Sequence, residues 1–366
     1  MPYEINGSNP EQLADVQSAL GLLNRIATFT TFAGGLSGNA TQTGLRNAAF
    51  GYYAADALTS GNDNTAFGYN ALSAVASANS NSAFGSQALQ VATGAGNSAV
   101  GHSALTSVGA GSQNSAIGYQ AAYNISTGIN NVAVGATSLF AAAGVSYNTA
   151  IGHNALFANT AAGNTAVGES AGYAITSATN FTAVGRRAAY SKTSGADCSF
   201  FGYSAGFSGM VGEAANSGIG ITAIGAYSFG HNTTGSYNTG LGRASGWYNA
   251  TGSNNAYFGY RGGYGNTTGG DNIAFGFYAG HNIATGSKNV FIGPYADAYV
   301  PNGTGMTATA VSGVGLTVGT YVYRVTFVID GVETGLSEPS ANTTTTSGNQ
   351  QVSLASIPVY TGQRTC

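Results

Sequence analysis

Paired carboxylates are the residues with which a repetitive β protein would cleave polysaccharides, because glycoside hydrolysis needs two acids at a set separation. The chain has 366 residues, and its repetitive part contains seven acids, which are Asp56, Asp63, Glu169, Asp197, Glu213, Asp271 and Asp297. Equivalent residues of stacked repeats would lie about 4.8 Å apart. No two of these acids recur in register on adjacent repeats, so we expect no enzymatic activity. A pair formed between subunits, as in a polysaccharide depolymerase, is the alternative.

Metal and cofactor chemistry has little support in the residue types. His102 and His153 each follow a regularly spaced glycine, but they lie three repeats apart, about 14 Å, and cannot share an ion. We expect these histidines to be solvated or packed side chains. The alternative is a ring of three histidines around a trimer axis, which could form a metal or anion site. Cys198 and Cys366 define neither a disulfide framework nor a metal site, and we expect Cys198 to be a small buried filler. No G-x-x-x-x-G-K-[ST] loop is present, so we expect no cofactor.

Aromatic residues become frequent between Tyr227 and Tyr299. Exposed Tyr and Trp on a rigid surface can stack on sugars, so Trp247, Tyr248 and Arg261 are our candidates for ligand contact. The alternative is that larger side chains widen the repeats near the C-terminal part of the chain.

The elements that must position these residues are set by fifteen glycines, spaced mostly 16 or 17 residues apart, with one interval of 23. They are Gly51, Gly68, Gly85, Gly101, Gly118, Gly135, Gly152, Gly168, Gly185, Gly202, Gly225, Gly242, Gly259, Gly276 and Gly293. This period fits one coil of a β-solenoid. The longer interval holds an insertion within Phe207–Ile221, which is either a binding loop or a tolerated loop.

The residues around each glycine predict a short strand that ends at a bend. The preceding residue is large and apolar in all fifteen repeats, and the residue four before is Asn in twelve. Alternation predicts Asn and Ala on one face and Ser/Thr and the large residue on the other. Stacked Asn side chains can form an amide ladder. Glycine accepts a positive φ and lets two backbones approach each other.

The large residues predict an assembly. A 17-residue coil encloses little space, and a long exposed apolar stripe is rare on soluble monomers. We therefore expect a parallel homotrimer in which the stripe is buried between copies. The alternative is a monomer whose stripe fills the interior of its own coils. Fifteen coils would form a spacer roughly 70 Å long.

Residues 1–27 form a predicted attachment segment, with a helix over 11–27. Leu13, Val16, Leu20 and Leu23 have heptad spacing, which favours a trimeric bundle or, alternatively, a helix that caps the first coil. Residues 28–46 form a lead-in, and residues 47–300 form the repeat array.

After a linker at 301–313, residues 314–366 read as an immunoglobulin-like or fibronectin III-like sandwich. Strands are predicted within Gly319–Ala341, around an Asp330-Gly331 hairpin, and over Gln350–Val359. Only about 60 residues remain, against roughly 100 for a complete sandwich, so we expect the chain to stop inside this domain.

Composition excludes several classes of partner. Charged residues make up 6% of the chain, and the net charge is −3 with no basic tract. Binding to nucleic acid through phosphate neutralisation is therefore not expected. No apolar run approaches the roughly 20 residues of a membrane span, and the N-terminus does not read as a secretory signal. We expect no membrane insertion.

The repeat unit resembles those of two known families. Its pattern is clear in Asn64-Thr65-Ala66-Phe67-Gly68, in Asn114-Ser115-Ala116-Ile117-Gly118 and in Asn148-Thr149-Ala150-Ile151-Gly152. It is similar to the N-[ST]-x-A-φ-G-x-x-A coils of trimeric autotransporter adhesin heads and to the NTAxGxxAL repeats of bacteriophage tail fibres.

The resemblance implies a trimeric β-roll. A phage fibre would be located in the virion, attached through its N-terminus to other virion or baseplate proteins, and its distal end would meet a host-surface glycan or receptor. The chain shows neither the signal peptide nor the C-terminal barrel of an autotransporter, nor a recognisable fibre chaperone. We therefore expect a non-enzymatic phage tail fibre, with a cellular trimeric adhesin as the alternative.

Overall fold

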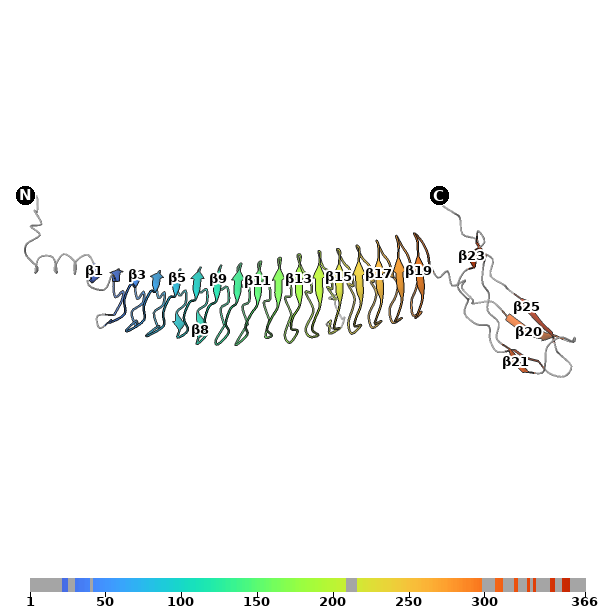
Figure 1. The fold of residues 1–366 in the computed structure, drawn as a ribbon, viewed down its shortest axis with the longest axis horizontal. Coiled ribbons are helices and arrows are strands. Elements are labelled where there is room, and N and C mark those ends of the chain that lie inside the picture. The colour runs from blue at the N-terminus through green and yellow to red at the C-terminus, as the bar shows by residue number, and fades with distance from the viewer. Residues whose placement is uncertain are drawn as a thin grey trace, which may run out of the picture.

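The computed structural model describes residues 22–25, 30–39, 42–208 and 216–297, and six short strands between residues 307 and 355. The described residues between 30 and 297 wind into a β-solenoid, with its coils stacked along one axis (Figure 1). The predicted all-β solenoid of about fifteen coils is confirmed. In the part of the chain that is described, no helix is long and apolar enough to cross a membrane.

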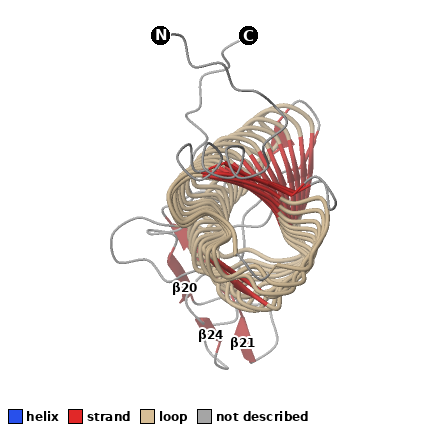
Figure 2. Cartoon of the chain, turned by 90° about the vertical axis from the view of Figure 1, so that its left-hand side faces the viewer, coloured by secondary structure: helices blue, strands red, loops and turns tan. Residues whose placement is uncertain are grey.

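One parallel sheet runs the length of the solenoid and receives one short strand from each coil (Figure 2). Its parallel strands are β2 (Thr30–Ala33), β3 (Ala48–Phe50), β4 (Thr65–Phe67), β5 (Ser82–Phe84), β7 (Ser98–Val100), β9 (Ser115–Ile117), β10 (Val132–Val134), β11 (Thr149–Ile151), β12 (Thr165–Val167), β13 (Thr182–Val184), β14 (Ser199–Phe201), β15 (Thr222–Ile224), β16 (Thr239–Leu241), β17 (Ala256–Phe258), β18 (Ile273–Phe275) and β19 (Val290–Ile292). Equivalent residues pair across every step, for example Ala116 with Ala133. A second, two-stranded sheet pairs β6 (Val91–Ala92) with β8 (Ser107–Gly109).

The fifteen predicted glycines, which we call the repeat glycines, mark the bend that follows each strand. Gly118 has a φ of +135°, and a Cβ placed on it would lie 2.7 Å from the carbonyl oxygen of Gly135 in the next coil. The fourteen repeat glycines that have a following coil show the same close contact. Both reasons given for glycine, its positive φ and the close approach of two backbones, therefore hold.

The lumen, the interior of the coils, is packed with small side chains, asparagines and leucines. The strand Ala and the Asn of the repeat motif are buried, as in Ala116 and Asn114. Opposite them, the residue four after the repeat glycine fills the remaining space with a buried Leu in five coils, which are those of Leu72, Leu89, Leu105, Leu139 and Leu156. These leucines adopt a positive φ of about 50°. The narrow coil therefore has its own apolar core.

The predicted amide ladder is present in the lumen. The side-chain Nδ2 of Asn131 donates to Oδ1 of Asn114 at 2.9 Å and to the carbonyl of Val145 at 2.8 Å. Oδ1 of Asn114 also accepts from the backbone N–H of Asn131 at 3.0 Å. An Asn of this kind joins two coils and spans its own coil, which satisfies the buried amide, whereas Asn148 donates to Ser146 O instead of across the coil.

The solenoid begins one coil earlier than predicted. Within the expected lead-in, Gly34 lies 17 residues before Gly51, has a φ of +125° and contacts the Gly51 backbone as a repeat glycine does. Strand β2 pairs in parallel with β3, which places this segment in the array.

At the N-terminus, Leu22–Arg25 form strand β1, which pairs antiparallel with β2. Leu23 therefore lies in a strand, and the predicted helix does not extend over these residues. Leu13, Val16 and Leu20 lie outside the described residues.

The insertion is described only at its two ends. Residues 209–215 lie outside the described residues, and the coil resumes at Asn216, which bridges in parallel to Lys192 of the preceding coil. Cys198 is buried, as expected.

Beyond residue 297 the structure describes three antiparallel strand pairs. These are β20 (Thr307–Val311) with β25 (Gln351–Ala355), β21 (Gly319–Tyr321) with β24 (Thr343–Thr345), and β22 (Val328–Ile329) with β23 (Val332–Glu333). The last pair flanks residues 330–331, where a hairpin was predicted. Strand β20 lies within the expected linker. The sandwich itself stays a prediction because the rest of this segment lies outside the described residues.

Candidate functional site

The large apolar residue before each repeat glycine points out of the coil. Together these residues form a column on the outer face of the sheet, which we call the apolar stripe. Ile117 is 51% exposed and Phe275 is 59% exposed. Phe50, Phe67 and Phe84 stack along the stripe with ring centroids 4.6 and 5.2 Å apart. The alternative in which the stripe fills the interior of its own coils is therefore wrong, because Asn, Ala and Leu occupy that space.

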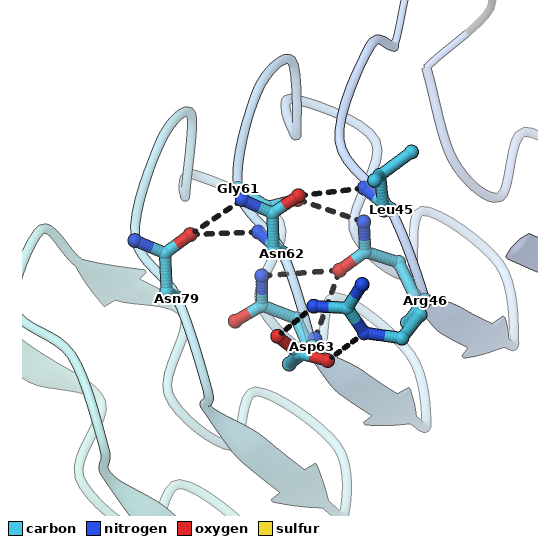
Figure 3. A network of polar contacts seen from close by, with 8 residues as sticks. Leu45, Arg46, Gly61, Asn62, Asp63 and Asn79 are labelled. Atoms are coloured by element: carbon cyan, nitrogen blue, oxygen red, sulfur yellow. Dashed lines mark hydrogen bonds and ion pairs between the residues drawn. The ribbon is translucent and has the colours of Figure 1, made fainter. Parts of the chain in front are cut away.

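A second outer column consists of exposed polar residues that join successive coils (Figure 3). The side-chain Oδ1 of Asn62 accepts from the backbone N–H of Leu45 at 2.8 Å, and Oδ1 of Asn79 accepts from the N–H of Asn62 at 2.8 Å. Arg46 forms a two-pronged ion pair with Asp63 of the next coil, at 2.5 and 2.7 Å. This contact lowers the pKa of the Asp63 carboxyl. The network joins successive coils and pairs the charges of Arg46 and Asp63.

Aromatic rings stack in a further column, which we call column 5 because its members lie five residues after each repeat glycine. Six half-buried rings form an unbroken stack with centroids 5.0 to 5.5 Å apart, which are Tyr123, Phe140, Phe157, Tyr173, Tyr190 and Phe207. The stack is interrupted at Gly230 and resumes with Trp247, Tyr264 and His281. Tyr264 and His281 stack at 4.9 Å.

A pocket of about 310 Å³ lies at this interruption, lined by Tyr227, Arg243, Ala244, Trp247, Arg261 and Tyr264. Tyr227, Ala244 and Arg261 lie two residues after successive repeat glycines, in what we call column 2. Trp247 and Tyr264 belong to column 5. Three successive coils therefore build one concave surface from equivalent positions.

The structure brings together two of the three predicted ligand-contact residues. Trp247 and Arg261 both line the pocket. Tyr248 follows Trp247, is 44% exposed and lies beside it, with ring centroids 6.4 Å apart, but does not line the pocket.

The arginines of the pocket differ from Arg46 and Arg186. They resemble Arg187, whose guanidinium lies over the ring of Tyr190 and forms no ion pair with the described residues. Arg46 and Arg186 each pair with a carboxylate of an adjacent coil, Asp63 and Glu169. Within the described residues, Arg243 and Arg261 have no carboxylate partner. The guanidinium of Arg261 donates to Tyr278 Oη at 3.1 Å, and that of Arg243 donates to Tyr260 Oη at 3.3 Å. None of the described residues that line the pocket is an acid.

Aromatic rings surround the Arg261 guanidinium. Its carbon lies 4.7 Å from the ring centroid of Tyr264, 5.4 Å from that of Tyr260 and 5.5 Å from that of Tyr278. Such contacts fix an arginine side chain without neutralising it.

The predicted acids do not converge. Asp271 accepts from Asn254 at 3.1 Å and Asp297 accepts from Asn282 at 3.0 Å, in different coils. Arg186 and Ser170 lower the pKa of Glu169, while burial raises the pKa of Asp56. Glu213 lies outside the described residues. Over the described part of the chain, no three His, Cys, Asp or Glu side chains gather closely enough to hold a metal ion.

Three of the four histidines pack against aromatic rings, and His153 is exposed. His102 stacks on Tyr119 at 5.5 Å, and His231 meets Trp247 edge-on at 4.7 Å. His281 stacks on Tyr264 in column 5.

Sequence reasoning missed Tyr227, Arg243, Ala244 and Tyr264 as pocket residues. Aligning the repeats on their glycines would have shown one signal, a single Ala between Tyr and Arg in column 2. The other signal is the only Gly of column 5, at position 230. Comparisons of the chain with protein-family models, with curated proteins and with solved structures found no match.

Proposed function

We propose that this chain is a trimeric structural fibre of a bacteriophage tail, a stiff spacer that links the virion to a glycan on the host surface. The observation that carries the proposal is the exposed apolar stripe, which places one large side chain per coil on the outer face of a continuous sheet. A stripe of this length on a soluble protein is best explained by burial against another surface. Identical copies aligned in parallel supply a stripe of the same length and period.

The spacer role is supported by the stacking pattern. Successive coils are bonded through strand pairing, and in most coils the Asn ladder or stacked rings add further contacts, so the array resists bending. The assignment to a phage fibre rests on the resemblance of the repeats to tail-fibre repeats. The glycan role is supported by the pocket, which combines aromatic rings with arginines on an outer face.

The trimer is tested by sedimentation mass. We expect three times the chain mass of 36.4 kDa for the wild type. Ile117→Glu would place three like charges within the stripe of the trimer, so we expect a lower mass or strongly weakened assembly. Thr127→Glu is the matched control, because this exposed residue lies in a turn of the same coil. A wild-type monomer would overturn the proposal.

Catalysis is tested separately by incubating the chain with host polysaccharide and measuring reducing ends. We expect none to be released. Their release would favour a depolymerase over a spacer.

A further inference from the structure

The pocket is a vacant place among the large side chains at the C-terminal end of column 2. In this column, from position 227 onwards, Tyr227, Arg261, Tyr278 and Tyr295 are large, and Ala244 is the one small residue. Adjacent coils lie about 4.8 Å apart, so Tyr227 and Arg261, two coils apart, are separated by about 10 Å. Rings that do fill neighbouring places of this column stack at one-coil spacing, as Tyr278 and Tyr295 do at 5.7 Å. The space above Ala244 therefore has the thickness of one ring.

The walls of this slot are held in place before any ligand arrives. A Cβ on Gly230 would lie 2.3 Å from Cζ3 of Trp247, so the indole ring rests against the glycine where column 5 is interrupted. The indole also meets the ring of Tyr227 edge-on at 5.2 Å. On the opposite wall, the Arg261 guanidinium lies over Tyr264 at 4.7 Å. A site with fixed walls binds at a lower entropic cost than one that must be ordered on binding.

The charge of the slot selects an anion. Arg243 and Arg261 donate only to tyrosine hydroxyls among the described residues, and each guanidinium has five N–H donors in a planar fork. This fork matches a carboxylate, which it binds through two parallel hydrogen bonds.

The shape of the slot selects a ring. The aromatic faces of Tyr227, Trp247 and Tyr264 offer apolar surface to the face of a flat or chair-shaped ring, and an isolated phosphate has no such face. A neutral sugar would stack on these rings but would leave both guanidinium groups without an anionic partner.

We propose that the slot between Tyr227 and Arg261 binds a sugar residue that carries a carboxylate. The sugar ring stacks in the place left vacant by Ala244, and its carboxylate accepts hydrogen bonds from Arg261 and Arg243. The carboxylate comes from either a hexuronic acid or a nonulosonic acid, which share this chemistry. This inference rests on the proposed glycan-binding function and names the class of glycan.

The test is titration calorimetry of the full chain with three oligosaccharides. One contains glucuronic acid, one is the same molecule with its carboxyl groups reduced to alcohols, and one ends in a nonulosonic acid. We expect binding of at least one acidic sugar, and we expect the reduced form to bind about 10- to 100-fold more weakly. Which acid binds identifies the source. Equal binding of the reduced form, or no acidic binding at millimolar concentration, would overturn the inference.

Two variants locate the binding. Ala244→Tyr fills the slot with the residue that column 2 carries in neighbouring coils, so it should fold normally and abolish binding. Thr137→Tyr is the matched control, because it makes the same kind of change in column 2 of a distant coil. Arg261→Gln retains the slot and should weaken binding about 10- to 100-fold. Binding that survives Ala244→Tyr would place the sugar elsewhere and refute the slot.

The outcome is separable from that of the proposed function. A chain with trimeric mass that binds a neutral glycan, unaffected by Ala244→Tyr, would contradict this inference and leave the fibre proposal intact. A monomeric chain that binds the acidic sugar in the slot would contradict the trimeric fibre proposal and support this inference.

Discussion

Phe200 occupies the space that a side chain on Gly206 would need. A Cβ on Gly206 would lie 2.2 Å from Cε1 of Phe200, whose ring is fully buried in the lumen. The same relationship joins Tyr257 to Gly263 at 2.4 Å and Phe32 to Gly38 at 2.5 Å. Coils with Ala two before the repeat glycine carry Leu, Ala or Gly at the opposite position, except the coil of Ala223, which carries the buried Phe229 there. The two positions therefore share one volume, which either residue can fill.

This shared volume predicts strong coupling between Phe200 and Gly206. Phe200→Ala should lower the free energy of unfolding by about 3–5 kcal/mol through a cavity. Gly206→Leu should cost at least about 1–3 kcal/mol through overpacking. The double variant restores the Ala and Leu of ordinary coils and should approach wild-type stability. The φ of Gly206, +63°, is close to the +53° of Leu72, so the backbone at position 206 accepts leucine.

Chemical denaturation of the two single variants and the double variant measures the coupling. Phe67→Ala is a suitable control, since Phe67 lies on the outer stripe and does not face the lumen. Additive losses in the double variant would show that the two positions do not share a volume.

The repeat itself was predictable from the residue pattern. Alternation within Asn114–Ile117 set the face on which each side chain lies, and the glycine period set the coil length. The positive φ of Gly118 and its contact with Gly135 also followed, because glycine alone lacks the Cβ that would collide.

Two features could not be predicted from a single repeat. The coil of Gly34 was missed because it replaces the usual Ala with Phe32 and the large apolar residue with Ala33, which hides the motif. The pocket was only partly predicted because it depends on three coils at once. Trp247 and Arg261 stood out by residue type, whereas Ala244 contributes by being small.

The repeat glycines should tolerate no side chain. Gly118→Ala combines a φ of +135° with a Cβ 2.7 Å from a backbone oxygen, so we expect severe destabilisation, by about 3 kcal/mol or more. Gly96→Asn is the contrasting change. Gly96 has a φ of +72°, a Cβ there would meet only Gln113 at 3.6 Å, and Asn130 occupies the equivalent place with a φ of +56°.

We expect Gly96→Asn to be neutral or stabilising by up to about 1 kcal/mol. Thermal and denaturant melts of both variants provide the measurement. Similar losses in the two would mean that backbone approach does not explain the glycine period.

Loss of an Asn side chain should cost more stability in the buried Asn ladder than in the outer polar column. Asn114→Ala removes a buried side chain that donates to Gly128 O at 2.8 Å and accepts from Asn131 N, and it leaves both backbone groups unsatisfied. We expect a loss of about 2–4 kcal/mol for the two groups. Asn62→Ala removes an equivalent bond to Leu45 N on the exposed column, where water replaces it, so we expect less than about 1 kcal/mol. Equal losses in denaturant melts would argue against the lumen ladder as the stabilising element.

Lys192 substitutes for a missing member of the Asn ladder. Cys198 stands where the repeat has Asn, and its coil therefore lacks the amide that normally donates across the lumen. The Nζ of Lys192 donates instead to Gly218 O at 2.7 Å, the carbonyl equivalent to Gly128 O. Lys192 is fully buried, with Cys198 and the ring of Phe200 beside it, and burial lowers the pKa of its ammonium group.

Restoring the ladder should make Lys192 dispensable. Lys192→Ile, which introduces the residue found at Ile175, should cost about 1–3 kcal/mol, because it leaves Gly218 O with only the weak thiol donor of Cys198 at 3.6 Å. Adding Cys198→Asn should recover that loss.

Burial of Lys192 should also make stability depend on pH. The unfolded chain keeps the lysine proton up to a pH of about 10.4, and the folded chain releases it at a lower pH. The wild type should therefore gain stability as the pH rises between these two pKa values. The Lys192→Ile single variant and the Lys192→Ile, Cys198→Asn double variant should lack that gain in stability. Denaturant melts from pH 7 to 10 give the difference in unfolding free energy between each variant and the wild type. The contributions of tyrosine titration are common to all chains and cancel in these differences. Two results would contradict the idea that Lys192 replaces an Asn of the ladder. One is a wild-type chain whose stability rises no more with pH than that of Lys192→Ile. The other is a Cys198→Asn change that recovers no stability in the Lys192→Ile chain.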